Sequence, residues 1–152
     1  MIVGVISDTH GLLRPEAVAA LRGSELILHA GDVGKPEILD ELRAVAPVVA
    51  VRGNVDTAVW ATALRLAEIV DAGGAQIFLL HDRAGLDFDP KAAGFAVVVS
   101  GHTHRPVAEH RDGVLYLNPG SAGPRRFTLP ITVARLDISL GRIEHQIIEL
   151  AP

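Results

Sequence analysis

Seven side chains of metal-ligand type stand just after apolar segments of this 152-residue chain. They are Asp8, His10, Asp32, Asn54, His81, His102 and His104. The preceding apolar runs span residues 1–6, 25–28, 47–51, 76–80 and 97–99. Open α/β sheets place their chemistry at the carboxyl ends of strands, so the pattern predicts one polar site on the rim of a sheet. Mixed carboxylate, amide and imidazole donors suit Mn²⁺, Fe²⁺, Ni²⁺ or Zn²⁺ better than Ca²⁺.

The spacing within the motifs supports a shared site. Asp8 and His10 are two residues apart, as are His102 and His104. In an extended segment, residues at this spacing project to the same face, so each pair predicts two convergent ligands.

Each of these residues taken alone has an ordinary structural interpretation. Asp8 or Asp32 could be a turn residue or a helix N-cap, and Asn54 after a glycine could be a turn. Four of the seven histidines, however, stand at strand ends beside other ligand types. The combination favours a metal site. The remaining histidines, His29, His110 and His145, lie inside strand patterns and are interpreted as structural.

The first third of the chain alternates strands with helices that begin at proline. The predicted elements are a strand at 2–6, a helix at 15–21, a strand at 25–28, a helix at 36–45 and a strand at 48–51. Continuous apolar strands separated by helices imply a sheet covered on at least one face.

The rest of the chain is rich in strands. We expect strands at 66–70, 76–80, 96–99, 107–110, 114–117, 131–138 and 143–150, with one helical turn at 90–95. Gly73–Gly74 and Asp112–Gly113 predict hairpin turns, as does the segment 139–141. A βαβαβ start followed by antiparallel strands predicts two packed sheets with helices outside.

Composition narrows the class of protein. Residues 1–152 are predicted to form a single soluble domain, because the length suits one core and 49% of the residues are hydrophobic. A net charge of −4 gives no reason to expect nucleic-acid or membrane binding. The chain has no cysteine, which excludes thiolate metal sites, and no signal-peptide or membrane-span pattern, so we expect a cytoplasmic protein. Motifs of phosphate-binding loops, zinc proteases and serine hydrolases are absent from the sequence.

The ordered motifs resemble those of the calcineurin-like metallophosphoesterases, especially their small single-domain bacterial and archaeal phosphodiesterase branch. The resemblance rests on Asp8-x-His10, Gly31–Asp32, Gly53–Asn54-x-Asp56, His81, Gly101–His102-x-His104 and the Asn-Pro-Gly-Ser segment 118–121. It implies an α/β (α+β) fold, a four-layer αββα sandwich of two mixed β-sheets flanked by helices, with a di-metal centre.

The resemblance also implies roles for the ligands. Asp8, His10 and His104 would hold the first metal, Asn54, His81 and His102 the second, and Asp32 would bridge them. Two metals about 3.5–4 Å apart share an activated hydroxide and stabilise in-line displacement at phosphorus. Asp32, Asn54 and His102, with that hydroxide, would form the catalytic group.

The chain departs from the family pattern at two positions. Many relatives carry a histidine after the motif asparagine that can protonate the leaving group, whereas this chain has Val55. General acid catalysis contributes about 10²–10⁴-fold, so poor leaving groups should react slowly. Glycine often follows the motif histidine, whereas here Asp82 adds a negative charge beside the cleft. Asp56 is interpreted either as a residue that orders a ligand or as an exposed loop carboxylate.

The predicted function is that of a metal-dependent phosphodiesterase acting on a small phosphodiester, with Mn²⁺ as the favoured metal and Fe²⁺, Ni²⁺ or Zn²⁺ as alternatives. A nucleotide pyrophosphatase, a cyclic-nucleotide phosphodiesterase and a non-catalytic scaffold are the alternatives. Arg125 and Arg126 could bind phosphate, but solvated surface is the simpler interpretation. Candidates for stacking on a base are Trp60, Tyr116 and the four phenylalanines.

Overall fold

The computed structural model describes residues 1–150 and builds its first sheet from the alternating start of the chain. Strands β1 (Ile2–Ile6), β2 (Leu26–His29) and β3 (Val48–Ala50) pair in parallel. Helices α1 (Pro15–Leu21) and α2 (Pro36–Arg43) connect them, and each begins at the predicted proline. Proline suits the first helical position because its fixed φ is already helical and its missing N–H would have no intrahelical partner.

The last two strands of the described chain return to this first sheet. Strands β9 (Thr132–Ser139) and β10 (Arg142–Glu149) form a hairpin, and β9 pairs antiparallel with β1. The strand order is β10-β9-β1-β2-β3, so residues from both ends of the sequence share one sheet.

The middle of the chain forms the second sheet, in the order β4-β5-β6-β8-β7. Its strands are β4 (Ala67–Ala72), β5 (Ala75–Leu80), β6 (Val97–Val99), β7 (Pro106–Arg111) and β8 (Val114–Pro119). The expectation of antiparallel strands was wrong for β5, β6 and β8, which run parallel. The connections between these strands are long enough for the chain to cross back before it pairs again.

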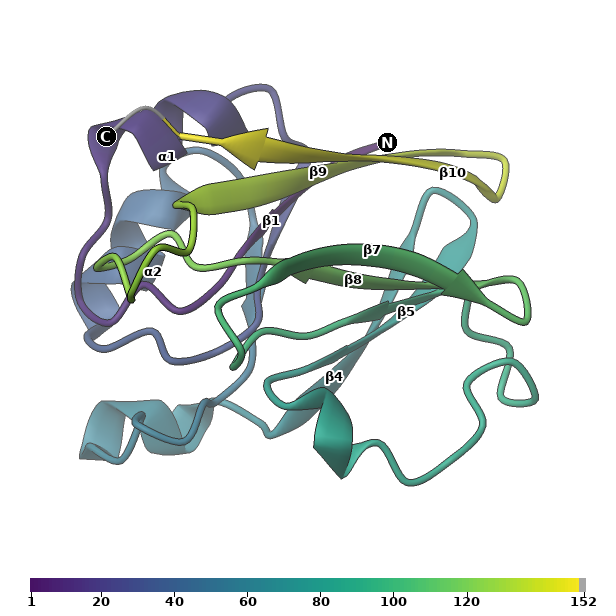
Figure 1. Cartoon of the computed structure of the whole chain (residues 1–152), viewed down its shortest axis with the longest axis horizontal. Coiled ribbons are helices and arrows are strands. Elements are labelled where there is room, and N and C mark those ends of the chain that lie inside the picture. The colour runs from purple at the N-terminus through teal and green to yellow at the C-terminus, as the bar shows by residue number, and fades with distance from the viewer. Residues whose placement is uncertain (151–152) are drawn as a thin grey trace.

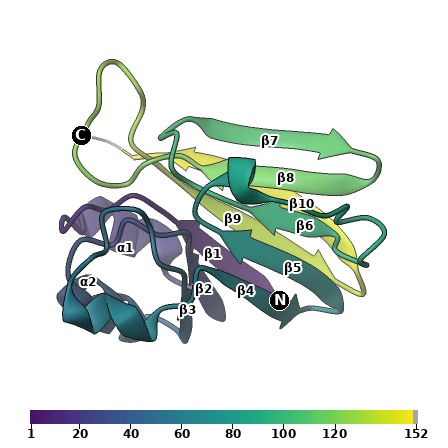
Figure 2. The same ribbon diagram turned by 90° about the horizontal axis from the view of Figure 1, so that it is seen from below.

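The two sheets pack face to face around a shared apolar core (Figures 1 and 2). Helices α1 and α2 cover the outer face of the first sheet, with Leu21, Ile38 and Leu42 buried there. The outer face of the second sheet is covered by the segment after β5, which includes the short 3₁₀ helix η2 (Arg83–Gly85) and packs Leu86 on the strands. The predicted sandwich of two mixed sheets is therefore confirmed, with a thinner outer layer over the second sheet.

A short link holds the two sheets together beside the strand ends. Val51, just after β3, forms an isolated parallel bridge with Arg65, just before β4. The Arg52 N–H donates to the Arg65 carbonyl at 2.8 Å. The 3₁₀ helix η1 (Val59–Ala63) fills the connection between them, an element that the sequence did not predict. This link fixes the carboxyl end of β3 against the second sheet.

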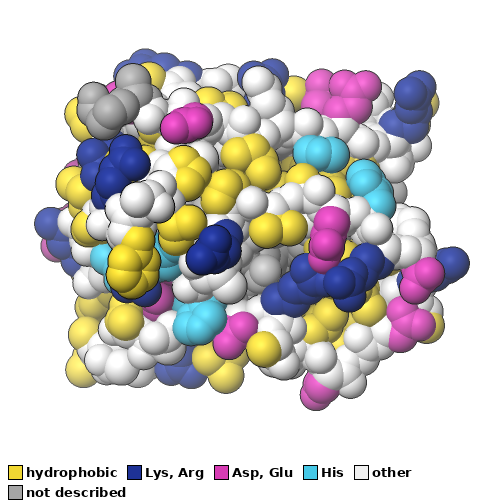
Figure 3. Space-filling model, in the orientation of Figure 1, with side chains coloured by type: hydrophobic (Ala, Val, Ile, Leu, Met, Phe, Trp, Pro, Cys, Tyr) yellow, Lys and Arg dark blue, Asp and Glu magenta, His cyan; other side chains and the backbone are white. Residues whose placement is uncertain are grey.

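The surface carries mixed charge. On the face shown in Figure 3, basic and acidic side chains are interspersed. No helix among residues 1–150 is long and apolar enough to span a membrane.

Candidate metal centre

All seven predicted ligands follow strands that have parallel partners. Asp8 and His10 follow β1, Asp32 follows β2 and Asn54 follows the end of β3, all in the first sheet. The second sheet contributes His81 after β5 and the pair His102 and His104 after β6. The structure therefore brings the seven residues together at the carboxyl ends of two sheets, whereas the sequence predicted the rim of one.

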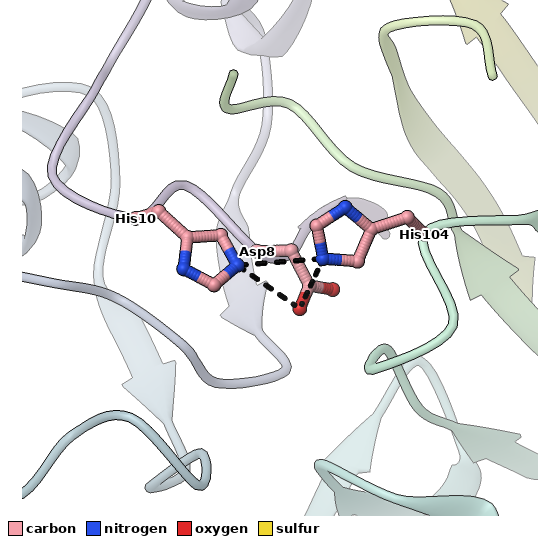
Figure 4. Close-up of side chains that lie close together, drawn as sticks. All are labelled: Asp8, His10 and His104. Atoms are coloured by element: carbon pink, nitrogen blue, oxygen red, sulfur yellow. Dashed lines mark hydrogen bonds and ion pairs between the residues drawn. The ribbon is translucent and has the colours of Figure 1, made fainter. Parts of the chain in front are cut away.

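The first group of side chains consists of Asp8, His10 and His104. The Nε2 atoms of His10 and His104 lie 3.3 Å apart. Asp8 Oδ1 lies 3.4 Å from His104 Nε2 and 3.8 Å from His10 Nε2. Figure 4 shows both imidazole rings directed at the same carboxylate from different loops. These three residues can hold one cation between them.

The second group is centred on His81 Nε2. This nitrogen lies 3.2 Å from Asp32 Oδ2, 3.0 Å from Asn54 Oδ1 and 3.3 Å from His102 Nδ1. Asp8, Asp32 and His81 also offer ligand atoms within 4.8 Å of one another. Asp8 therefore contributes to both groups, although the resemblance placed it on one metal only.

Asp32 stands between the two groups. Its Oδ2 is 3.2 Å from His81 Nε2 and 3.7 Å from His10 Nε2. Its other oxygen, Oδ1, accepts the Val55 N–H at 3.0 Å, which fixes the orientation of the carboxylate. This position is the one that a bridging ligand would need.

The backbone reason for convergence differs from the predicted one. Five of the candidate ligands have positive φ rather than extended backbone; they are Asp8 (56°), His10 (47°), Asp32 (56°), His102 (71°) and His104 (63°). The argument from extended spacing was therefore wrong, although the paired side chains do converge. Aspartate and histidine tolerate the left-handed region better than most residues, and such strain is concentrated at functional sites.

Glycines allow the ligand loops to approach one another closely. A Cβ on Gly31 would lie 2.8 Å from His81 Nδ1, and a Cβ on Gly53 would collide with the Asp32 carboxylate. A Cβ on Gly101 would collide with Ser7 and would lie 2.6 Å from Asp8 Oδ2. The glycines that precede candidate ligands in the sequence motifs are thus needed because a side chain at these positions would clash with the neighbouring loops.

Three polar residues that the sequence analysis did not single out individually fix the positions of candidate ligands. The Ser7 hydroxyl donates to Asp8 Oδ2 at 2.7 Å. Asn118 Nδ2 donates to the Gly101 carbonyl at 2.9 Å, which fixes the loop of His102. The Ser121 hydroxyl donates to the Asp8 carbonyl at 3.1 Å. The Asn-Pro-Gly-Ser segment was noted only as part of the resemblance, and its contacts give it a structural role.

Asp56 is a buried clamp and not an exposed loop carboxylate. It is 3% exposed, and its oxygens accept the N–H groups of Val33 at 3.1 Å, Gly34 at 3.0 Å and Gly53 at 2.9 Å. These bonds join the loop of Asp32 to the loop of Asn54. Asp56 therefore positions two candidate ligands without contacting them.

His29 is buried and bonds to the loops of Asp8 and Asp32, in agreement with the structural role predicted for it. Its Nδ1 accepts the Gly31 N–H at 3.1 Å, and its Nε2 lies 3.0 Å from Thr9 Oγ1. The Thr9 hydroxyl donates to the Val33 carbonyl at 2.8 Å, so it must accept the Nε2–H of His29. The bonding thus requires the neutral ring, and burial lowers the pKa of His29 to about 4.

Burial and neighbouring groups shift the pKa values of three candidate ligands. Burial raises the pKa of Asp8, against the hydrogen bond from Ser7. Burial opposes ionisation of Asp32, but its bonds to His81 and the Val55 N–H outweigh burial and lower its pKa to about 2. Burial also lowers the pKa of His104, against the attraction of Asp8.

Two observations show that the donor set fits divalent cations. Asp8 Oδ1 is buried and has no hydrogen-bond partner among residues 1–150. His81 Nδ1 lies 2.7 Å from the Ala30 carbonyl, so it carries the proton and a neutral ring directs the Nε2 lone pair at Asp32. Two acceptors 3.2 Å apart repel unless a proton or a cation lies between them. Burial lowers the pKa of His81, but the bonds to Asp32 and Ala30 outweigh it and raise the pKa, so a proton meets this demand when no metal does.

Two further residues singled out from the sequence, Asp82 and Arg126, lie near histidines of the centre. The Asp82 carboxylate caps η2 by accepting the Ala84 N–H at 3.0 Å, and its Oδ2 is 3.7 Å from His102 Nε2. The positive charge of Arg126 contributes to the lowered pKa of His104, whereas Arg125 donates to the Leu129 carbonyl at 3.3 Å. Phosphate binding by this arginine pair stays a prediction.

Comparison with known proteins identifies the family. The model of the calcineurin-like phosphoesterase superfamily domain matches residues 1–141. A probable metallophosphoesterase of Methanothermobacter thermautotrophicus is 41% identical over 149 residues, which cover 90% of this chain and 87% of that protein. Phosphodiesterase YfcE of Escherichia coli is 32% identical over 155 residues, with 86% and 84% covered. The solved structure of an archaeal phosphodiesterase superposes with a TM-score of 0.80 at 26% identity, covering 97% of this chain and 100% of that one. The chain belongs to the calcineurin-like phosphoesterase superfamily.

Proposed function

We propose that the protein is a metal-dependent phosphodiesterase that hydrolyses a small phosphodiester to a monoester and an alcohol. The observation that carries this proposal is the position of Asp32, whose Oδ2 lies 3.2 Å from His81 Nε2 and 3.7 Å from His10 Nε2. One carboxylate thus stands between two imidazole groups, a position from which it could serve two cations. Relatives named as phosphodiesterases support the choice of reaction.

The proposed ligands divide into two sets. Asp8, His10 and His104 would hold one cation; Asn54, His81 and His102 would hold the other; and Asp32 would serve both. Divalent cations bound there supply Lewis acidity to the phosphoryl oxygens and make a water nucleophile more acidic. We propose Mn²⁺, and the same donors accept Fe²⁺, Ni²⁺ or Zn²⁺.

The chain's own residues limit which esters it can cleave. The His102 side chain is 43% exposed and can therefore meet a phosphoryl group entering from solvent. Val55, 47% exposed beside Asn54, has no proton to give to a leaving group. The enzyme should therefore favour activated leaving groups, such as aryl alcohols, over ordinary alkyl alcohols.

The alternatives are a nucleotide pyrophosphatase, a cyclic-nucleotide phosphodiesterase and a non-catalytic scaffold. A scaffold has no need of a complete donor set, and here all seven side chains are retained and converge. We propose a small-molecule substrate rather than nucleic acid or membrane, which the net charge of −4 supports, and a cytoplasmic location.

The test is hydrolysis of bis-4-nitrophenyl phosphate by chelator-treated protein, titrated separately with Mn²⁺, Ni²⁺, Zn²⁺ and Mg²⁺. The variant Asp32→Asn removes the charge between the two groups, and Asp71→Asn is the matched control on an exposed strand position. We expect metal-restored turnover in the wild type and in Asp71→Asn, and a loss of at least about 10²-fold in Asp32→Asn. Two equivalents of bound metal without turnover would contradict the proposal and favour the scaffold.

A further inference from the structure

A cavity of about 460 Å³ opens directly beside the second group of metal ligands. Asn54 and His81 form part of its wall, so a molecule held at the metal centre can extend into it. Much of the remaining wall is apolar, formed by Leu66, Phe78 and Phe88. The volume lies within the range of about 300–1,000 Å³ that is typical of small-molecule sites.

The aromatic side chains of the wall pack against one another and against a third ring. The rings of Phe78 and Phe88 meet edge to face, with centroids 4.9 Å apart and planes at 82°. Phe95 adds a third ring, 5.3 Å from Phe78. Edge-to-face packing fixes ring orientation, so the cavity presents a preformed apolar surface.

The exposed side chain of Leu66 forms another part of the cavity wall. Leu66 is 65% exposed although it stands between two ordered segments, the Arg65 bridge to Val51 and strand β4. When an apolar ligand group covers this side chain, apolar surface is removed from water, which favours binding.

The charges around the cavity argue against a second anionic group. Asp82 and Asp87 line it, and among residues 1–150 Arg52 is the one lysine or arginine in its wall. Two carboxylates against one guanidinium disfavour a polyphosphate chain, which a nucleotide pyrophosphatase would have to accommodate. The apolar wall also offers few partners for the polar edges of a nucleobase, and unpaired buried polar groups are costly.

We propose that this cavity is the subsite for an uncharged aromatic group of the phosphodiester substrate. The inference rests on the proposed function, because it needs the phosphoryl group at the metal centre. It assigns to Leu66, Phe78 and Phe88 the selection of aryl esters. Val55 limits the enzyme to good leaving groups, and the cavity adds a reason why the group should be aromatic.

The test compares two ligands that differ only in the organic group, phenylphosphonate and methylphosphonate, by isothermal titration calorimetry on Mn²⁺-loaded protein. We expect phenylphosphonate to bind about tenfold or more tightly. In Leu66→Ser and Phe88→Ala this ratio should fall severalfold. Ile69→Ser is the control. Ile69 has the same exposed fraction as Leu66, 65%, and lies nearby on β4, but it does not line the cavity. Leu66 is exposed, so its substitution leaves the fold intact.

The outcomes separate the two proposals. Metal-restored hydrolysis without a phenyl preference, or a preference that persists in Leu66→Ser and Phe88→Ala, would overturn the aryl subsite alone. No metal-restored hydrolysis and no phosphonate binding would count against the proposed function.

A second pair of ligands, ribose 5-phosphate and uridine 5′-monophosphate, tests whether the cavity prefers a nucleobase. A gain in affinity from uracil equal to the gain from phenyl would overturn the preference for an apolar ring.

Discussion

His10 Nε2 and His104 Nε2 lie 3.3 Å apart although the two histidines belong to loops of different sheets. Their sequence separation is 94 residues, and the Nε2 atoms of both rings are directed at the Asp8 carboxylate. A cation held here would therefore join the two layers of the sandwich at their strand ends.

This relationship predicts that metal binding stabilises the whole fold. A ligand that binds only the folded state at 100-fold over its Kd adds about 2.7 kcal/mol to the free energy of unfolding. We expect Mn²⁺ to raise the melting temperature of chelator-treated protein, measured by calorimetry. The double variant His10→Gln/His104→Gln should lose most of this rise. His110→Gln/His145→Gln alters two exposed histidines, with ring centroids 6.0 Å apart, and should keep it. An equal rise in both double variants would mean that the metal binds elsewhere.

A histidine at position 55 should restore cleavage of poor leaving groups. Val55 is 47% exposed and adjacent to Asn54, so a larger side chain has room there. We expect Val55→His to raise kcat/KM for an alkyl diester such as glycerophosphocholine by about 10²-fold, and to change bis-4-nitrophenyl phosphate hydrolysis far less. Val55→Gln is the control, because it adds polarity without an ionisable proton. Similar gains on both substrates would refute a role in protonating the leaving group.

Removing the charge of Asp56 should loosen the loops of two candidate ligands. Asparagine would keep only one acceptor oxygen. Its NH₂ group would face backbone N–H groups that now donate to the Asp56 carboxylate. We expect Asp56→Asn to lower the free energy of unfolding by about 2–4 kcal/mol in urea titrations, and metal affinity by about 10–100-fold. Asp71→Asn, on an exposed position of β4, should change neither quantity measurably. Unchanged stability in Asp56→Asn would argue against the clamp.

The neutral state of His29 should make stability depend on pH. Burial lowers its pKa in the folded state to about 4, from 6.5 when unfolded. Between these values the unfolded chain binds the extra proton, so the free energy of unfolding falls as pH decreases from 6.5 to 4. The total loss is about 3 kcal/mol. Urea unfolding of metal-free protein at pH 7 and pH 4.5 should show most of this loss, about 2 kcal/mol, in wild type and in His145→Gln, and a smaller one in His29→Gln. Parallel pH curves for wild type and His29→Gln would contradict it.

The sequence by itself indicated the candidate site because its seven candidate ligands lie in short local motifs. Each apolar run predicts a strand, and a polar residue at its end must lie near a sheet edge, so Asp8, Asp32 and His81 were predictable from the sequence. The prolines at 15 and 36 likewise marked the helix starts, and Gly73–Gly74 marked the β4–β5 turn. These are local choices of backbone conformation, which neighbouring residues largely fix.

Only the tertiary structure decided how distant segments meet. Strand pairing joins residues far apart in sequence, so the parallel β5-β6-β8 order and the return of β9 to β1 had no local signal. The left-handed backbone at His102 and His104, with φ of 71° and 63°, also had no local signal in the sequence. The burial of Asp56 and the cavity beside His81 likewise depend on loops from several strands packing together. Local chemistry thus indicated the candidate ligands, whereas long-range packing set their geometry and formed the cavity beside His81.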